Sequence, residues 1–155
     1  MTASDTSSSG AIREGPFWDV MAGRAAPPPA AVTLGFQLVD VDPDAGTITT
    51  SFRATDAFPN PFGMIQGGFL AAMLDDTMGP AMFIHAEGRL FTPTIDMHVS
   101  FLEPARPGPI VGEGQVIRAG GSIAFLEGRL SDAKGSLLAR ATASARLVAA
   151  EKALA

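Results

Sequence analysis

Apolar and polar residues alternate in two short segments of the chain, "TLGFQLVDVD" from Thr33 and "TITTSFRAT" from Thr47. A period of two is typical of strands that are buried on one face, and β-branched residues favour strands further. The turn-forming residues Pro-Asp-Ala-Gly separate the two segments. The pattern therefore predicts a β-hairpin.

A long apolar run with helical spacing follows, from Gln66 to Ala86. Apolar residues occupy nearly every side of this helix, so other elements must enclose it. Pro80 lacks a backbone N–H, and its ring clashes with the carbonyl of Asp76. We therefore expect a kink or a break near Gly79.

After Gly88 the period returns to two. Turn signals divide this part into four strand segments, "LFTPTIDMHVSFLEP", "GPIVGEGQVIRAGG", "SIAFLEGRLSDAKG" and "SLLARATASARLVA". In the last two segments we expect one face to be lined by Ile123, Phe125, Leu137, Ala139 and Ala141. A hairpin, one long helix and a four-stranded meander predict an α+β fold in which an antiparallel sheet covers the helix.

The chain of 155 residues is expected to form one domain with extensions. Residues 1–30 comprise a disordered Ser/Thr-rich tail over Met1–Gly10, a short helix that starts at Pro16, and a Pro-rich linker. Residues 31–149 form the domain itself, and residues 150–155 form a C-terminal tail.

Composition narrows the possible partners. Hydrophobic residues make up 46% of the chain and charged residues 17%, which is apolar for this length and favours a subunit that buries surface against its own copies. The net charge of -5, with scattered basic residues, disfavours nucleic acid as a partner. An anionic ligand would need local arginines, for which Arg89, Arg106 and Arg118 are candidates.

The chain has no cysteine, which excludes thiol nucleophiles, disulfides and thiolate metal sites, and fits a reducing cytoplasm. The two histidines, His85 and His98, lack a third ligand at metal-like spacing, so no metal site is expected. Neither a secretory signal pattern nor a run of about 18 apolar residues occurs. We therefore expect a cytoplasmic protein that does not enter a membrane.

Two adjacent glycines, Gly67 and Gly68, fall where the loop "NPFGMIQ" enters the helix. The first N–H groups of a helix have no partner within it, and glycine lets an electron-rich oxygen approach them, as an oxyanion site requires. The pair can also serve a tight turn and close backbone packing. The pattern leaves both interpretations open.

Two adjacent aspartates lie in the middle of the same helix. Asp75 shares its face mainly with glycine and alanine, which leave space for a ligand or another backbone, whereas Asp76 shares its face with bulky residues. A catalytic role is open for these carboxylates, and so is a solvated or capping role.

Helix geometry separates Gly67 from Asp75. Eight residues at about 1.5 Å each place them roughly 12 Å apart along the axis, too far to act on the same carbonyl group. If both act on one substrate, they must come from different subunits whose helices lie side by side and antiparallel. The function would then require at least a dimer.

These segments together resemble the hotdog-fold acyl-CoA thioesterases, in the branch that contains the phenylacetate-pathway thioesterase and one type of 4-hydroxybenzoyl-CoA thioesterase. The family pattern is Asn-Pro-x-Gly-x-x-His-Gly-Gly, with an acidic residue eight positions after the first glycine of the Gly-Gly pair. Here it appears as "NPFGMIQGG" followed by Asp75. The strands "TIDMHVSFLEPARPG" and "RAGGSIAFLEGRLSDAKGSLLARATASARL" also match, so that the resemblance covers about Thr33 to Leu147.

The resemblance implies hydrolysis of an acyl-CoA thioester to a free acid and CoA, without a cofactor, by a homotetramer built as a dimer of dimers. Asp75 would be the nucleophile or general base, and the Gly67 N–H would polarise the carbonyl. Asn60 would hold the water or the carbonyl oxygen, and Thr94 would help to position the water. Asp76 matches no catalytic position and is assigned to capping or to the interface.

Gln66 departs from the pattern, which most often has His at this position. A glutamine can orient a thioester carbonyl through a hydrogen bond, but it cannot shuttle a proton near neutral pH. This disfavours a dehydratase or hydratase on the same fold. A non-catalytic acyl-CoA-binding protein is the other alternative.

The stretch "GGSIA" at residues 120–124 looks like the nucleophile elbow of serine hydrolases, but it lies between two strands, so Ser122 is not expected to be a nucleophile. The resemblance instead places Gly121, Ser122 and Arg118 near the CoA phosphates. Gly68 and Arg106 complete the expected substrate contacts, although a solvated loop position for Arg106 is equally open.

Overall fold

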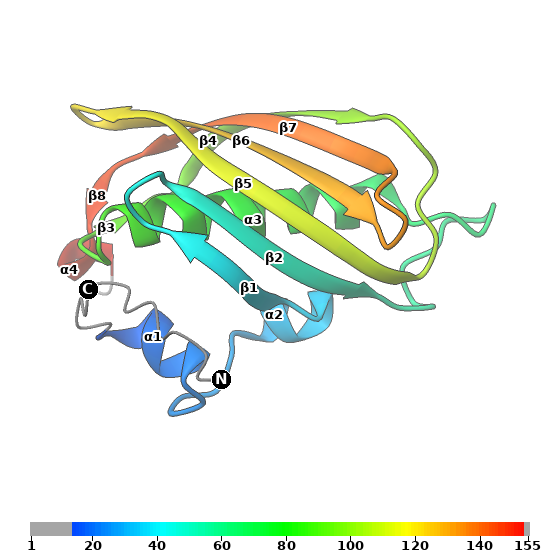
Figure 1. Cartoon of the computed structure of the whole chain (residues 1–155), viewed down its shortest axis with the longest axis horizontal. Helices are drawn as coiled ribbons and strands as arrows, with labels where there is room; N and C mark the ends of the chain where they lie inside the picture. The colour runs from blue at the N-terminus through cyan, green and yellow to red at the C-terminus, as the bar shows by residue number, and fades with distance from the viewer. Residues whose placement is uncertain (1–13, 154–155) are drawn as a thin grey trace, which may run out of the picture.

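The computed structural model describes residues 14–153, and the predicted tail Met1–Gly10 lies outside them. The elements are α1 (Pro16–Met21), α2 (Pro29–Leu34), β1 (Gln37–Asp42), β2 (Thr47–Ala54), α3 (Gly67–His85), β3 (Leu90–Phe91), β4 (Thr94–Phe101), β5 (Gly108–Gly120), β6 (Ile123–Asp132), β7 (Leu137–Arg146), β8 (Val148–Ala149) and α4 (Ala150–Ala153). A six-stranded antiparallel sheet curls over α3 (Figure 1), which confirms the predicted α+β arrangement.

The strand order of the large sheet is β1-β2-β5-β6-β7-β4. The hairpin β1–β2 and the meander β5–β6–β7 pair as predicted. The prediction that β4 belongs to the meander is wrong, because β4 pairs with β7 at the far edge of the sheet. Alternation identifies a strand but not its partner, since several strands of the sheet pack one face against the same helix.

The segment before β1 contains a helix that the sequence analysis did not predict. Pro29 occupies the first turn of α2, and Gly35 ends it in the left-handed conformation with φ 65°. The strand expected from Thr33 therefore begins only at Gln37. Proline is compatible with the first helical turn as well as with an extended linker, so composition did not distinguish the two.

The central helix α3 runs without a break from Gly67 to His85, with Pro80 inside it. Of the kink or break predicted near Gly79, the break does not occur and the kink stays a prediction. The predicted bounds hold, since Gln66 and Ala86 are the two caps. One side of α3 packs against β2, β5 and β6. This burial stabilises the helix although Pro80 has no N–H to donate to the carbonyl of Asp76.

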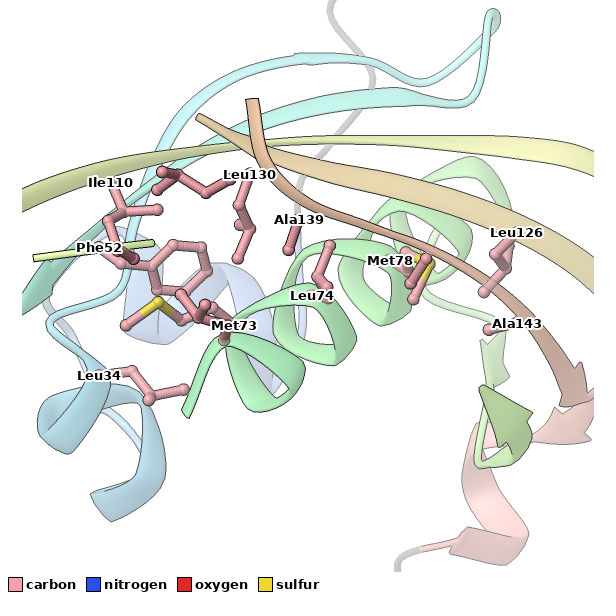
Figure 2. Packing of buried hydrophobic residues seen from close by; sticks show 14 of the residues in the cluster. Leu34, Phe52, Met73, Leu74, Met78, Ile110, Leu126, Leu130, Ala139 and Ala143 are labelled. Atoms are coloured by element: carbon pink, nitrogen blue, oxygen red, sulfur yellow. The ribbon is translucent and has the colours of Figure 1, made fainter. Parts of the chain in front are cut away.

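The core lies between α3 and the concave face of the sheet. Met73, Leu74 and Met78 are almost completely buried there, and Figure 2 shows them among side chains from the strands. Two glycines allow this close approach. A Cβ at Gly112 of β5 would lie 2.5 Å from Thr77 Oγ1, and one at Gly128 of β6 would lie 2.9 Å from Met78 Cγ.

The inner face of β6 differs from the prediction. Ala124, Leu126 and Leu130 are buried, whereas Phe125 is 52% exposed and Ile123 is only half-buried. The pairs Leu126–Ala143 and Leu130–Ala139 place the even-numbered residues of β6 on the face toward α3. Since β6 carries apolar residues on both faces, alternation alone could not select the correct one.

The expected face of β7 is largely correct. Ala139 and Ala141 are buried as predicted. Leu137, which the sequence analysis placed with them, is 37% exposed at the start of the strand.

Candidate active site

The N-terminus of α3 carries an unpaired backbone donor. Gln66 caps the helix, because its Oε1 accepts a hydrogen bond of 2.7 Å from the Gly68 N–H. Within residues 14–153, no hydrogen bond uses the Gly67 N–H. The helix dipole adds partial positive charge at this end. The Gly67 N–H can therefore donate to an external oxygen, whereas the Gly68 N–H is engaged by Gln66.

Asn60 stands in the loop before the helix, with its side-chain oxygen already engaged. Oδ1 accepts hydrogen bonds from the N–H groups of Phe62 (2.9 Å) and Met64 (3.3 Å). Its Nδ2 has no hydrogen-bond partner among residues 14–153. Asn60 therefore shapes the loop and offers only a donor to a ligand.

Asp75 and Thr94 form a hydrogen-bonded pair between α3 and the start of β4. The Thr94 hydroxyl donates to Asp75 Oδ1 at 2.6 Å, and both side chains are exposed. A threonine hydroxyl that donates to one carboxylate oxygen fixes the orientation of the carboxylate and leaves Oδ2 for a water or a substrate.

Asp76, the neighbour of Asp75, is in a different environment. Burial raises the pKa of the Asp76 carboxyl, and the charge of Asp75 raises it further. Its Oδ2 is buried and has no hydrogen-bond partner among the described residues. The carboxylate therefore caps no backbone group in this part of the chain, and its assignment to a subunit interface stays a prediction.

Four of the five predicted catalytic residues line two separate cavities, and Gln66 lines neither of these two. Asn60 and Gly67 line a cavity of about 380 Å³ that is bordered by the end of β4 and the residues after it. Asp75 and Thr94 line a cavity of about 1100 Å³ beside the middle and the C-terminal half of α3, and no residue lines both cavities. One chain therefore presents two incomplete groups of polar atoms.

The predicted CoA contacts also divide into two groups. Arg106 lies just before β5, whereas Arg118 lies near the other end of that strand, roughly 40 Å away at about 3.3 Å per residue. Gly121, with φ 60°, and Ser122 form the exposed turn from β5 to β6 (Figure 1). This confirms that Ser122 is not on a strand-to-helix elbow. Neither arginine has an ion-pair partner within residues 14–153.

The histidines lie apart from these cavities. A ring nitrogen of His85, Nδ1, is 2.8 Å from the carbonyl oxygen of Pro43 and joins α3 to the β1–β2 turn, while His98 is exposed on β4. Between residues 14 and 153, no three His, Asp or Glu side chains gather in a geometry that could hold a metal ion. In the same range, no helix combines the length and the hydropathy needed to cross a bilayer.

Two features of the site went unpredicted. The ring of Phe101 covers Gly67 so closely that a Cβ there would lie 2.9 Å from the ring. The helices α1 and α2 contribute walls to the larger cavity. Both are contacts between residues distant in sequence, for which a single sequence carries no local signal.

Comparisons with known proteins agree with this fold. The model of the thioesterase superfamily matches residues 62–139, about half of the chain. A phenylacetic acid degradation-related protein of Ralstonia eutropha JMP134 is 38% identical, with a TM-score of 0.79, and the match covers 84% of this chain and 98% of that one.

Two further proteins are similar at lower identity. The Saccharolobus solfataricus esterase homologue SSO2140 is 29% identical over 112 residues, which cover 70% of this chain and 79% of its own length. The structure of smu.793 from Streptococcus mutans UA159, bound to acetyl-CoA, shares the fold with a TM-score of 0.65 and 16% identity, covering 74% of this chain and 89% of that one. The matching family model and the Ralstonia relative show that the chain belongs to the thioesterase superfamily, has the hotdog fold and is a thioester hydrolase.

Proposed function

We propose that the protein hydrolyses acyl-CoA thioesters at a site that two copies of the chain build together. The observation that carries this proposal is the separation of Asp75 and Gly67 into different cavities of one chain. The rise of an α-helix sets them roughly 12 Å apart along its axis. Two antiparallel copies of α3 would bring the Asp75 of each chain to the Gly67 of the other. Each dimer would therefore contain two equivalent sites.

The reaction needs a polarised carbonyl and a nucleophile. The Gly67 N–H and the Nδ2 group of Asn60 donate to the carbonyl oxygen, on which negative charge develops. Asp75, oriented by Thr94, either attacks the carbonyl carbon or takes a proton from the water that attacks it. The C–S bond then breaks, and the sulfur leaves as the thiolate of CoA. If water attacks, the free acid forms directly; if Asp75 attacks, a water then hydrolyses the acyl–Asp75 anhydride to the free acid and restores the carboxylate. Gln66 holds the helix start in place through Gly68.

The surface of a single chain supports the assembly. Gly68, Ala72 and Asp75 are exposed along one side of α3, although this helix is apolar overall. Small residues let a second helix approach closely. The edge strand β4 also exposes Ile95 (55%) and Phe101 (54%) and contains no lysine or proline, the residues that usually block strand pairing. Both features favour a homodimer, and a dimer of dimers is the assembly that we propose.

The CoA moiety would lie across both chains. Arg106 of one chain follows Ala105, which lines the Gly67 cavity, and would contact CoA there. Further contacts to CoA would come from Arg118, Gly121 and Ser122 of the other chain. Unpaired arginines and turn amides are suited to phosphates. The acetyl-CoA bound to the Streptococcus mutans protein, which shares this fold, is consistent with such a ligand.

The direct test is an assay of free thiol release from aliphatic and aromatic acyl-CoAs, with enoyl-CoA hydration measured in parallel. Asp75→Asn keeps the shape of the side chain and removes its charge, so kcat should fall by about 10²- to 10⁴-fold. Asp40→Asn, an exposed carboxylate on β1, is the matched control and should keep full turnover. Unchanged turnover in Asp75→Asn would refute the assignment, and hydration without thiol release would indicate a hydratase.

A further inference from the structure

The short helix α1 forms a wall of the cavity that contains Asp75. Phe17, Val20 and Met21 of α1 line it, opposite Phe83 of α3 and Phe91 of β3. The ring of Phe17 packs against that of Phe83, with 5.4 Å between ring centroids. This contact joins α1 to the C-terminal half of α3. The N-terminal segment thus belongs to the site rather than being a mere extension.

The charges around this cavity are all of one sign. Its only ionisable side chains are Asp75 and Asp76, and no Lys, Arg or His within residues 14–153 lines it. An acyl group that ends in a carboxylate would meet two acidic groups and no cation there. The unpaired arginines Arg106 and Arg118 do not line it either, so the phosphates of CoA have their partners elsewhere.

The remaining surface of the cavity is mostly apolar, with Gln37, Thr92 and Thr94 as its other polar side chains. Phe17, Val20 and Met21 are only half-buried in the single chain, and Phe91 is 49% exposed. Its volume of about 1100 Å³ exceeds the needs of a two-carbon acyl group and lies just above the usual range for ligand pockets. An occupant that covers these side chains must itself be apolar and must reach beyond Asp75.

We propose that α1 is the specificity element of the enzyme and that its substrates carry an uncharged, apolar acyl group long or broad enough to reach Phe17. This inference rests on the proposed function, because it takes Asp75 to mark the position of the reacting carbonyl. The acyl group extends from Asp75 between α1 and α3, and the ring of Phe17 determines how long a chain is accepted.

The first arm of the test compares kcat/KM of the wild-type protein for acetyl-, butanoyl-, hexanoyl- and glutaryl-CoA. From acetyl to hexanoyl the value should rise by roughly fourfold per methylene group, the usual gain from burying that much apolar surface. Glutaryl-CoA carries a carboxylate where hexanoyl-CoA carries an ethyl group. Its kcat/KM should be lower than that of hexanoyl-CoA by about tenfold or more, because the cavity offers only like charges.

The second arm changes the wall itself. Phe17→Ala should lower the ratio of hexanoyl-CoA to acetyl-CoA turnover by about tenfold, while acetyl-CoA turnover, which does not need the wall, stays within about twofold. Phe17→Trp should also lower this ratio, by shortening the cavity. Arg24→Ala is the control on the same segment, because Arg24 pairs with Asp19 outside the cavity, and it should leave the ratio unchanged.

The outcomes separate the two proposals. If acetyl-CoA is hydrolysed but the ratio is the same in Phe17→Ala and the wild type, or if glutaryl-CoA is preferred, the inference about α1 is wrong while the proposed function stands. If no CoA thioester is hydrolysed by the wild type, the proposed function itself fails. A loss of dimer mass in Phe17→Ala with an unchanged ratio would show that a second copy of the chain fills the cavity, which also overturns the inference.

Discussion

At the residue scale, the hydrogen bond from Thr94 is the contact that orients Asp75, the carboxylate that we propose as the catalytic group. It is short, at 2.6 Å, and joins two exposed side chains that would otherwise be free to rotate. A hydrogen bond to an ionised group contributes about 1.5–3 kcal/mol. The bond is therefore strong enough to restrict Asp75 to one orientation.

The corresponding variant is Thr94→Val, which keeps the shape of the side chain and removes the donor. We expect kcat to fall by about tenfold or more with little change in KM, because the substrate still binds but meets a less ordered carboxylate. Thr94→Ser retains the hydroxyl and should keep most of the rate. Equal losses of kcat in Thr94→Val and Thr94→Ser would contradict this prediction, because Thr94→Ser keeps the hydroxyl that donates to Asp75.

Asp76 leads to a prediction about stability and pH. Burial and the charge of Asp75 raise its folded-state pKa above the value of about 4 typical of an unfolded chain. The folded state therefore binds this proton more tightly, and the stability that Asp76 contributes is lost as the pH rises through the folded pKa. Asn cannot ionise, so Asp76→Asn should match the wild type near pH 4 and be more stable near pH 8.

Urea denaturation at the two pH values measures this difference. A variant that is less stable than the wild type at pH 8 would contradict the account, since it would mean that the ionised carboxylate has a favourable partner. The partner would then be sought on a neighbouring subunit.

The sequence distinguished the two aspartates but not the role of Gln66. A helical wheel places small residues beside Asp75 and bulky ones beside Asp76, and the structure shows Asp75 exposed and one oxygen of Asp76 buried. The capping bond from Gly68 to Gln66 was not predicted. Glutamine is not among the preferred N-cap residues, and the bond depends on a side-chain conformation that a sequence does not encode locally.

At the element scale, the packing of α3 on the sheet depends on glycines in the strands. Gly112 of β5 faces Thr50 and Thr77, whose hydroxyl oxygens lie 3.0 Å apart in the core. A methyl group at Gly112 has no space, because it would lie 2.5 Å from Thr77 Oγ1. Helix and strand would have to move apart.

We therefore expect Gly112→Ala to lower the free energy of unfolding by about 1–3 kcal/mol, the usual cost of overpacking a core. The matched control is Gly120→Ala in the same strand, where a Cβ would meet nothing within 4 Å. Chemical denaturation of both variants measures the effect. Similar denaturation midpoints for Gly112→Ala and Gly120→Ala would contradict the close packing of α3 on β5.

The elements themselves were predictable in part. The bounds of α3, the first hairpin and the last three strands follow from periodicity and turn residues, which are local signals. Local signals do not predict the position of β4 beside β7 or the inner face of β6, because both depend on which strands meet around the helix. α2 was missed because proline fits two local structures, and the Pro80 break was overpredicted because burial outweighed local propensity.

At the scale of the whole molecule, Gly67 and Asp75 face different cavities of one chain. The geometry of an α-helix sets the distance between them along α3. In the function that we propose, a second copy of the chain completes each half of the site. The central claim of the account is therefore that each reaction uses Asp75 from one chain and the Gly67 N–H from another.

Complementation between two inactive variants tests this claim. Gly67→Pro removes the N–H at the first helical position, where proline is favoured, and Gln66, with φ -63° and ψ 134°, has the backbone that precedes proline. Gly67→Ala is the control, because it meets the same ring of Phe101 but keeps the N–H, and it should remain more active than Gly67→Pro.

The decisive measurement is thiol release from an equimolar mixture of Gly67→Pro and Asp75→Asn chains, unfolded together and refolded. The account predicts recovery to about a quarter of wild-type activity, because half of the random dimers are mixed and each mixed dimer has one intact site of two. Activity in the mixture no higher than that of either variant alone would contradict it, since the two groups would then have to act within one chain.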